Sequence, residues 1–234
     1  MTPKNNPTDI QGLLDYQKRQ LALTNVTESE ARQRRVIANL EKWTAGLPSE
    51  LKRATPNSLP KGIIDKVKAT HLKPPFQKYT IISSEDLKVA KFTSYAIMYA
   101  LIKSGFVTPS EIRTSDILDG YNNINGMFNS RRWKDSFFDS DAKVLVIEGS
   151  SKALSNLGSK GEDQFWREIL EFTKNNDKLV IITYTTEKSE REKDVFIPLL
   201  TSDKTLNFRL IKNSLFVNIN KEEEGEMLNW IKKN

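Results

Sequence analysis

The chain of 234 residues has no cysteine, a single histidine and no long apolar run. The lack of cysteine excludes disulfides and thiolate-bound metals, and His71 alone cannot form a histidine-pair metal site. No apolar run approaches the roughly 18 residues that span a bilayer, and the first ten residues have no apolar stretch typical of a secretory signal. We therefore expect a cytoplasmic protein with no metal centre and no membrane contact.

Positive charge is concentrated in the N-terminal third. Residues 1–78 contain 14 Lys and Arg against 7 Asp and Glu, whereas residues 79–234 contain 22 against 23. A basic arm favours an acidic partner, either nucleic acid or an acidic protein surface. Solubility alone is the other interpretation of an excess of this size.

Two capping-box spacings, Thr8-x-x-Gln11 and Thr27-x-x-Glu30, predict helix starts within residues 1–46. Apolar residues follow each of them at helical spacing: Ile10, Leu13, Leu14 and Leu21 after the first, and Val36, Ile37, Leu40 and Trp43 after the second. We predict two amphipathic helices, about 9–24 and 28–45. Their apolar stripes must pack within the chain or against another chain, and the sequence leaves both open.

The rest of the chain divides into a proline-rich connector, residues 47–78, and an α/β domain, residues 79–234. We predict one short helix, 63–68, in the connector. We predict strands near 79–83, 111–114, 143–148, 178–183, 207–211 and 215–219, and helices near 90–104, 115–120, 126–138, 161–175 and 222–233. The apolar runs 144–147 and 179–182 are typical of strands buried on both faces of a mainly parallel sheet. This alternation predicts a three-layer α/β sandwich with its ligand site at the carboxyl ends of the strands.

Several short motifs occur in a recognisable order between residues 43 and 186. They are Ala45-Gly46-Leu47-Pro48 with Arg53-Ala54-Thr55, the helical stretch Ala96 to Gly105, Ser115-Asp116-Ile117-Leu118, the strand Val144 to Gly149 and the strand Leu179 to Thr185. In order and spacing they resemble the bacterial helicase loaders of the DnaC/DnaI type and the related IstB transposition ATPases, which are AAA+ proteins. The resemblance implies an AAA+-like P-loop sandwich, with a Walker B strand at 144–149 and a sensor-1 strand at 179–185.

The phosphate-binding loop departs from the family pattern, which reads G-x-x-x-x-G-K-[ST]. Aligned on the helix that follows, Ser84 and Val89 replace the two glycines, Ala90 the lysine and Lys91 the Mg²⁺-binding hydroxyl; a one-residue slip would put Lys91 in the lysine position, with Phe92 after it. The loop needs glycine so that backbone N–H groups can wrap a phosphate, whereas Val89 disfavours positive φ. Glu85 and Asp86 would each repel a phosphate by roughly 1 kcal/mol at contact distance in water.

The other nucleotide motifs are degenerate as well. The Walker B pair is reduced to Glu148-Gly149, and Thr185 stands where the family has the sensor-1 asparagine. Phosphoryl transfer depends on a lysine, Mg²⁺ and a water-orienting group placed around the γ-phosphate. We therefore expect no catalytic residue, no cofactor and no enzymatic activity.

The resemblance implies two contacts, one with a replicative DNA helicase and one with single-stranded DNA. For the helicase we predict the stripe and its neighbouring arginines, Val36, Ile37, Leu40, Trp43, Arg32 and Arg35. For the strand we predict Arg131, Arg132, Trp133 and Lys134, because cations beside aromatic rings suit phosphates and stacked bases. A core-facing helix with solvated cations is the alternative for that segment.

These expectations describe a helicase loader or adaptor in DNA replication that works without ATP hydrolysis. The alternative is a phage or mobile-element inhibitor that binds and blocks the host helicase or its loader. An enzyme with an unrecognised site is the third possibility, but no Ser/His or paired-carboxylate arrangement with motif-like spacing supports it.

Overall fold

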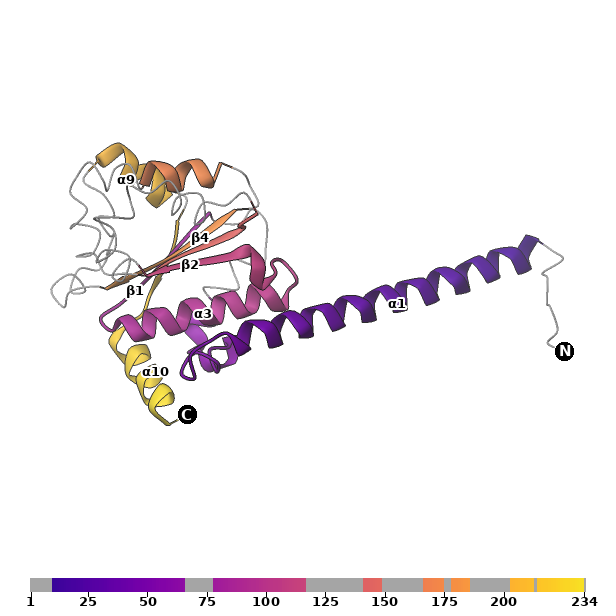
Figure 1. Ribbon diagram of the computed structural model, residues 1–234, viewed down its shortest axis with the longest axis horizontal. Coiled ribbons are helices and arrows are strands. Elements are labelled where there is room, and N and C mark those ends of the chain that lie inside the picture. Colours follow the sequence, from indigo (N-terminus) through magenta and orange to yellow (C-terminus); the bar gives the residue numbers. More distant parts are fainter. Residues whose placement is uncertain are drawn as a thin grey trace.

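A five-stranded parallel sheet forms the centre of the molecule in the computed structural model (Figure 1). The structure describes residues 10–65, 78–116, 141–148, 166–174, 178–185, 203–212 and 214–233. The strands are β1 (Tyr79–Ser84), β2 (Ile112–Asp116), β3 (Val144–Glu148), β4 (Leu179–Thr185) and β5 (Ser214–Asn218). Their order is β2-β3-β4-β1-β5, and every neighbouring pair is parallel. The predicted parallel sheet is confirmed.

Helices cover both faces of the sheet. The helices are α1 (Ile10–Ala45), α3 (Leu87–Lys103), α9 (Lys204–Lys212) and α10 (Lys221–Lys233), with short 3-10 turns η1 (Pro56–Ser58) and η2 (Pro109–Glu111) and helical residues 61–65 and 166–172. One apolar core lies between the sheet and α3, and a second lies between the sheet and α9 with residues 166–172. Adjacent residues of β1 supply both cores, Ile82 the first and Ile81 the second. The molecule is the three-layer α/β sandwich that the sequence predicts.

The predicted strand at 207–211 is wrong, because these residues belong to helix α9. Asp203 begins the helix, since its carboxylate accepts hydrogen bonds from the backbone N–H groups of Thr205 and Leu206 at 2.9 and 3.1 Å. Leu206 and Leu210, one helical turn apart, are both buried in the core. The helical spacing of these two leucines outweighs the strand propensity of the residues between them.

The predicted pair of N-terminal helices is also wrong, because one continuous helix of 36 residues runs from Ile10 to Ala45. The junction Thr24-Asn25-Val26 contains neither proline nor glycine, so nothing interrupts the backbone ladder there. The Thr27 capping box therefore lies inside a helix. At 1.5 Å per residue, α1 is about 54 Å long, and much of it projects beyond the α/β domain (Figure 1).

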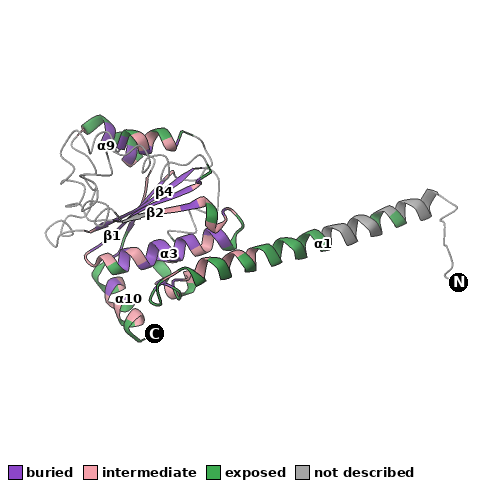
Figure 2. Ribbon diagram, in the orientation of Figure 1, coloured by how far each residue is buried: buried purple, intermediate pink, exposed green. Residues whose placement is uncertain are grey.

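Among the described side chains of α1, those that pack on the domain lie in its C-terminal part, along α3. Leu40 and Trp43 lie against the core, and the Trp43 ring stacks on Tyr95 with centroids 5.8 Å apart. Arg32 donates a hydrogen bond to the carbonyl of Ser104 at the end of α3, at 3.4 Å. Residues 27–35 are exposed, as Figure 2 shows in green.

The proline-rich segment after α1 folds onto the domain as well. Its four buried residues, Leu51, Ala54, Leu59 and Ile63, belong to the same core as α3. The described part of the connector, residues 47–65, is therefore continuous in packing with the α/β domain. None of the helices in the described residues has the length and apolarity needed to cross a membrane.

Candidate functional site

The residues that the sequence analysis aligned with nucleotide motifs meet at the carboxyl ends of β1, β3 and β4, next to the first turn of α3. The connection from β1 to α3 has only two residues, Glu85 and Asp86. Residues 87–91, which the alignment places in the phosphate loop, are already helical. Without glycine, the chain forms a short capped turn instead of the wide loop that surrounds a phosphate.

The first turn of α3 uses its own backbone donors. The Asp86 carboxylate accepts a hydrogen bond from the Lys88 N–H at 2.7 Å, as an N-cap residue does. The N–H groups of Val89 and Ala90 donate to the Asp86 carbonyl at 3.1 and 3.2 Å. A helix N-terminus is an anion site because its N–H groups are free, and here those of residues 88–90 are occupied.

A second carboxylate enters the same turn from the C-terminal helix α10. The Glu224 side chain accepts a hydrogen bond from the Asp86 N–H at 2.6 Å and another from the Ser84 hydroxyl at 3.1 Å. Glu224 is 6% exposed. A buried carboxylate that accepts from a backbone N–H and a hydroxyl makes the contacts that a phosphate makes in a P-loop. Glu224 therefore takes the place of an anionic ligand at this turn.

The position of Glu224 is fixed by the start of α10. Asn220 and Glu223 form a reciprocal capping box, in which the Glu223 N–H donates to the Asn220 side chain at 2.9 Å and the Asn220 N–H to the Glu223 carboxylate at 3.0 Å. Met227, one turn further along, is buried in the core. The cap and this apolar anchor together direct Glu224 into the turn after β1.

Lys91 and Glu148 form an ion pair, with Nζ and Oε2 2.7 Å apart. The Lys91 side chain is 34% exposed, whereas that of Glu148 is 6% exposed. Lys91 therefore neutralises the one remaining Walker B carboxylate, and it is not directed at an external phosphate. Among the described residues, Glu148 Oε1 and Thr185 Oγ1 are buried without a hydrogen-bond partner.

The arrangement can hold internal ion pairs but offers little to a nucleotide. The described residues contain no group of three or more His, Asp or Glu side chains placed to hold a metal ion. The backbone donors of the turn bind Asp86 and Glu224, and the nearest lysine binds Glu148. A triphosphate would have to displace these groups, at the cost of exposing buried carboxylates to its own negative charge.

The predicted helicase-binding residues divide between two sides of α1. Leu40 and Trp43 pack on the core, Val36 is half-buried near Gly105, and Ile37 is 55% exposed. Arg35 is exposed and donates to the Ala31 carbonyl of its own helix at 3.3 Å. Only part of the stripe is therefore available to another molecule.

The remaining predicted site residues lie outside the described residues. These are Gly149 of the Walker B pair and the proposed strand-binding residues Arg131, Arg132, Trp133 and Lys134. Glu224, in contrast, is a site residue that the sequence did not reveal. It lies in the run Glu222-Glu223-Glu224, which is typical of a solvated helix start, and no local signal separates the buried glutamate from the exposed Glu222 and the half-buried Glu223.

The fold is similar to domain III of the replication initiation protein DnaA from Thermotoga maritima. The TM-score is 0.51 with 10% sequence identity, over 76% of this chain and 72% of the other. No protein-family model matches the sequence, and no curated protein matches it either. The chain thus shares the α/β fold of that domain, and the polar groups around the turn between β1 and α3 are engaged in internal contacts.

Proposed function

We propose that this protein is a nucleotide-independent adaptor in DNA replication, which binds a replicative helicase through α1 and single-stranded DNA through its α/β domain. The main support for this proposal is the turn between β1 and α3, hereafter the phosphate turn, whose hydrogen-bond donors bind carboxylates of the chain itself. Its backbone donors are used by Asp86 and Glu224, and Lys91 is paired with Glu148. An AAA+-like domain that is closed in this way is suited to binding partners and lacks the groups for phosphoryl transfer.

The shape of α1 supports the helicase contact. A helix that is polar on most sides and projects from its domain gains little from its own chain, and it becomes useful when another molecule covers it. Residues 27–35 are exposed, and Ile37 is an apolar side chain on the part of α1 that remains open. Helical spacing places Arg34 beside Ile37, so an apolar groove with acidic edges would match this side.

Ile37→Asp tests the helicase contact without disturbing the core. The substitution would replace an apolar contact at the helicase interface with a buried negative charge. We therefore expect at least a tenfold loss of helicase affinity in a pull-down without nucleotide. Ala31→Asp is the matched control, because it places the same charge at an exposed position on another side of α1. Equal helicase retention by both variants would contradict the proposed α1 contact.

A helicase-loading assay on a single-stranded circle then distinguishes an adaptor from an inhibitor. An adaptor increases the amount of helicase on the DNA when no nucleotide is bound to the adaptor itself. A protein that lowers helicase loading while still binding the helicase would instead be the blocking type of partner.

A further inference from the structure

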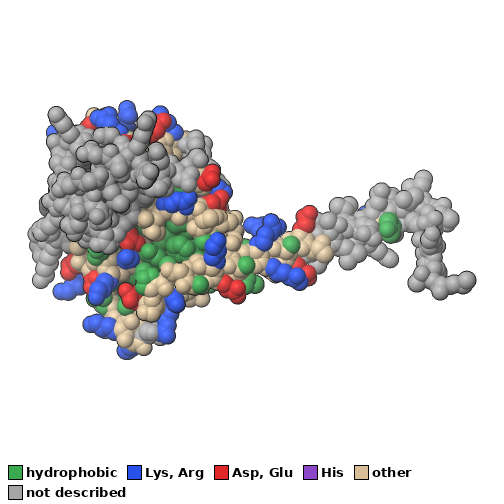
Figure 3. Space-filling model, in the orientation of Figure 1, with side chains coloured by type: hydrophobic (Ala, Val, Ile, Leu, Met, Phe, Trp, Pro, Cys, Tyr) green, Lys and Arg blue, Asp and Glu red, His purple; other side chains and the backbone are tan. Residues whose placement is uncertain are grey.

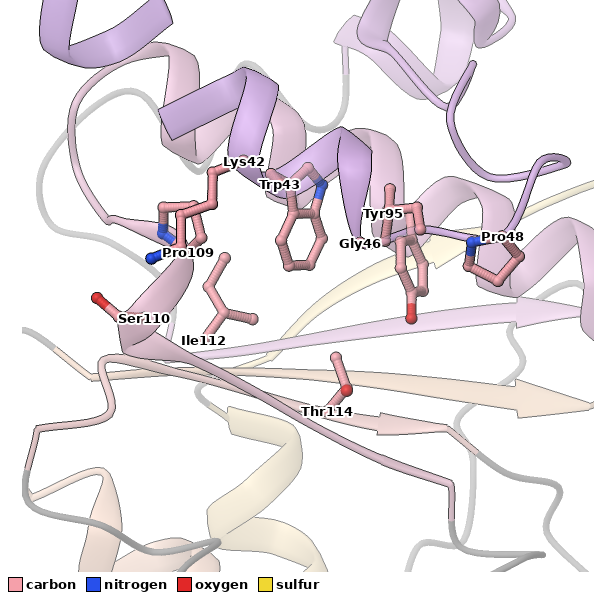
Figure 4. Close-up of a pocket in the computed structure, with 10 residues that line it drawn as sticks. Lys42, Trp43, Gly46, Pro48, Tyr95, Pro109, Ser110, Ile112 and Thr114 are labelled. Carbon is pink, nitrogen blue, oxygen red and sulfur yellow. The ribbon is translucent and has the colours of Figure 1, made fainter. Parts of the chain in front are cut away.

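A cleft opens where the end of α1 meets α3 and the edge of the sheet (Figure 4). Its volume is about 320 Å³, which is within the range of small-molecule sites. The lining comes from three places: Lys42 and Trp43 at the end of α1 with Gly46, Leu47 and Pro48 just after it, Tyr95 from α3, and Pro109, Ser110, Ile112 and Thr114 from η2 and β2. The surface view shows apolar side chains gathered at the base of α1, with Lys and Arg nearby (Figure 3).

The walls of the cleft are flat rings. Trp43 and Tyr95 are stacked, with an interplanar angle of 29°, and both rings extend toward Thr114 in Figure 4. Pro48 and Pro109 add two further rings to the lining. Ring walls of this kind accept a planar heterocycle more readily than a branched aliphatic chain, because a flat ligand can stack on them.

Charge and hydrogen-bonding groups surround these rings. Lys42 is exposed, and it has no ion-pair partner among the described residues. The hydroxyl of Thr114 lies on the opposite wall and can bond to the polar edge of a heterocycle, whereas that of Ser110 is hydrogen-bonded to Thr108 at 3.0 Å. Lys91 lies on the far side, with its Nζ 6.0 Å from the centroid of the Tyr95 ring, and its charge is paired there with Glu148.

The wall formed by η2 is held in place by an ionised carboxylate. Glu111 accepts from the Thr108 N–H at 2.7 Å and pairs with Lys143 at 2.8 Å. Burial raises the pKa of Glu111, but the hydrogen bonds from Lys143 and Thr108 outweigh it and hold the pKa below its ordinary value. The Pro109–Ser110 side of the cleft is therefore preorganised at neutral pH.

We propose that this cleft binds one base of single-stranded DNA, stacked against Trp43, with the adjoining phosphate near Lys42. The inference rests on the proposed function and adds a binding site that is separate from the segment 126–134. The combination of aromatic stacking walls and an unpaired cation is the usual arrangement for sequence-tolerant single-strand binding. The basic excess of residues 1–78, 14 cations against 7 anions, favours the same ligand.

The edge of β2 argues against an extended peptide as the ligand. A peptide that adds to a sheet needs the free N–H and C=O groups of the edge strand. Here the Arg113 guanidinium donates to the carbonyls of Ser110 and Ile112, at 2.5 and 3.2 Å. The Ile112 N–H is also used, since it donates to the Pro109 carbonyl. This end of the edge is blocked, whereas the ring-lined cleft beside it stays open.

Filling the cleft tests the proposal. Thr114 is exposed on a strand, so Thr114→Phe suits the strand while placing a ring in the cleft. We expect it to weaken binding of an oligothymidine about tenfold or more, with an unchanged melting curve. Lys42→Ala should reduce the slope of log affinity against log salt by about 1. Lys52→Ala, an exposed lysine outside the cleft, is the matched control and should leave the slope unchanged.

Photocrosslinking identifies the stacked residue directly. An oligothymidine with 5-iododeoxyuridine should crosslink to Trp43 or Tyr95 in the full chain. Unchanged affinity of Thr114→Phe together with crosslinks only elsewhere would overturn the cleft while leaving the adaptor proposal intact. Absence of any oligonucleotide binding would overturn both the cleft and the DNA contact, but not the helicase contact. Competition by free thymidine monophosphate at equal concentration would show a mononucleotide site and would also overturn the proposal.

Discussion

At the scale of single residues, the most informative side chain is Glu224. Two neighbours in the acidic run at the start of α10 have other environments: Glu223 caps the helix, and Glu222 is exposed. Glu224 alone is buried and binds the turn after β1. The lack of glycine in this turn is visible in the sequence, but the carboxylate that accepts its hydrogen bonds comes from 140 residues further along the chain.

Glu224→Ala should destabilise the fold, because it leaves the buried Ser84 hydroxyl and the part-buried Asp86 N–H without their acceptor. A lost acceptor for a buried donor costs about 1–3 kcal/mol, so we expect a decrease of that size in the free energy of unfolding. Urea denaturation at pH 7 measures it, and Glu222→Ala is the exposed control. If both variants unfold at the same urea concentration, Glu224 does not stabilise the turn.

The ion pair between Lys91 and Glu148 could not be predicted from the sequence. The alignment assigned Lys91 to either of two nucleotide-contacting positions, but it could not show that the lysine binds Glu148 at 2.7 Å. The pairing depends on the tertiary structure: α3, which follows β1 in the chain, also packs on β4, and β4 is the sheet neighbour of β3. Local sequence contains no record of that neighbourhood.

At the scale of elements, the buried strands were the most predictable and the amphipathic helices the least. Continuous apolar runs identified β3 and β4, because strands buried on both faces carry no polar side. In α9, apolar and polar residues alternate over a stretch that is too short to distinguish the period of a helix from that of a strand. For α1, a favourable cap sequence was mistaken for a helix start, although a helix can pass through such a sequence when no breaker precedes it.

Side-chain truncation to alanine should destabilise the protein on the packed side of α1 and have little effect on its exposed side. Leu40 packs on the core and is half-buried, so Leu40→Ala should cost about 1–2 kcal/mol, below the range of about 2–5 kcal/mol for fully buried leucines. Ile37 is 55% exposed, so Ile37→Ala should change stability by no more than about 0.5 kcal/mol. Thermal unfolding of the two variants measures the contrast. Equal destabilisation would mean that Ile37 is also part of the packed face.

At the scale of the whole molecule, the fold and the contacts at the turn after β1 indicate different roles. The fold is similar to that of domain III of DnaA, at 10% sequence identity. The donors of the turn between β1 and α3 bind carboxylates of the chain itself, and the nearby Lys91 is paired with Glu148. Such a domain retains its scaffold and its surfaces. We therefore propose that partners contact α1 and the ring-lined cleft, and not the phosphate turn.

We infer that the phosphate turn is closed to nucleotide. Calorimetric titration of the full chain with ATP·Mg²⁺ tests this inference. Affinity tighter than about 100 μM requires roughly 5.5 kcal/mol of binding free energy, from a turn whose donors are already bound to Asp86 and Glu224. We predict no heat of binding up to that concentration. Saturable one-to-one binding with a Kd below about 100 μM would contradict the account.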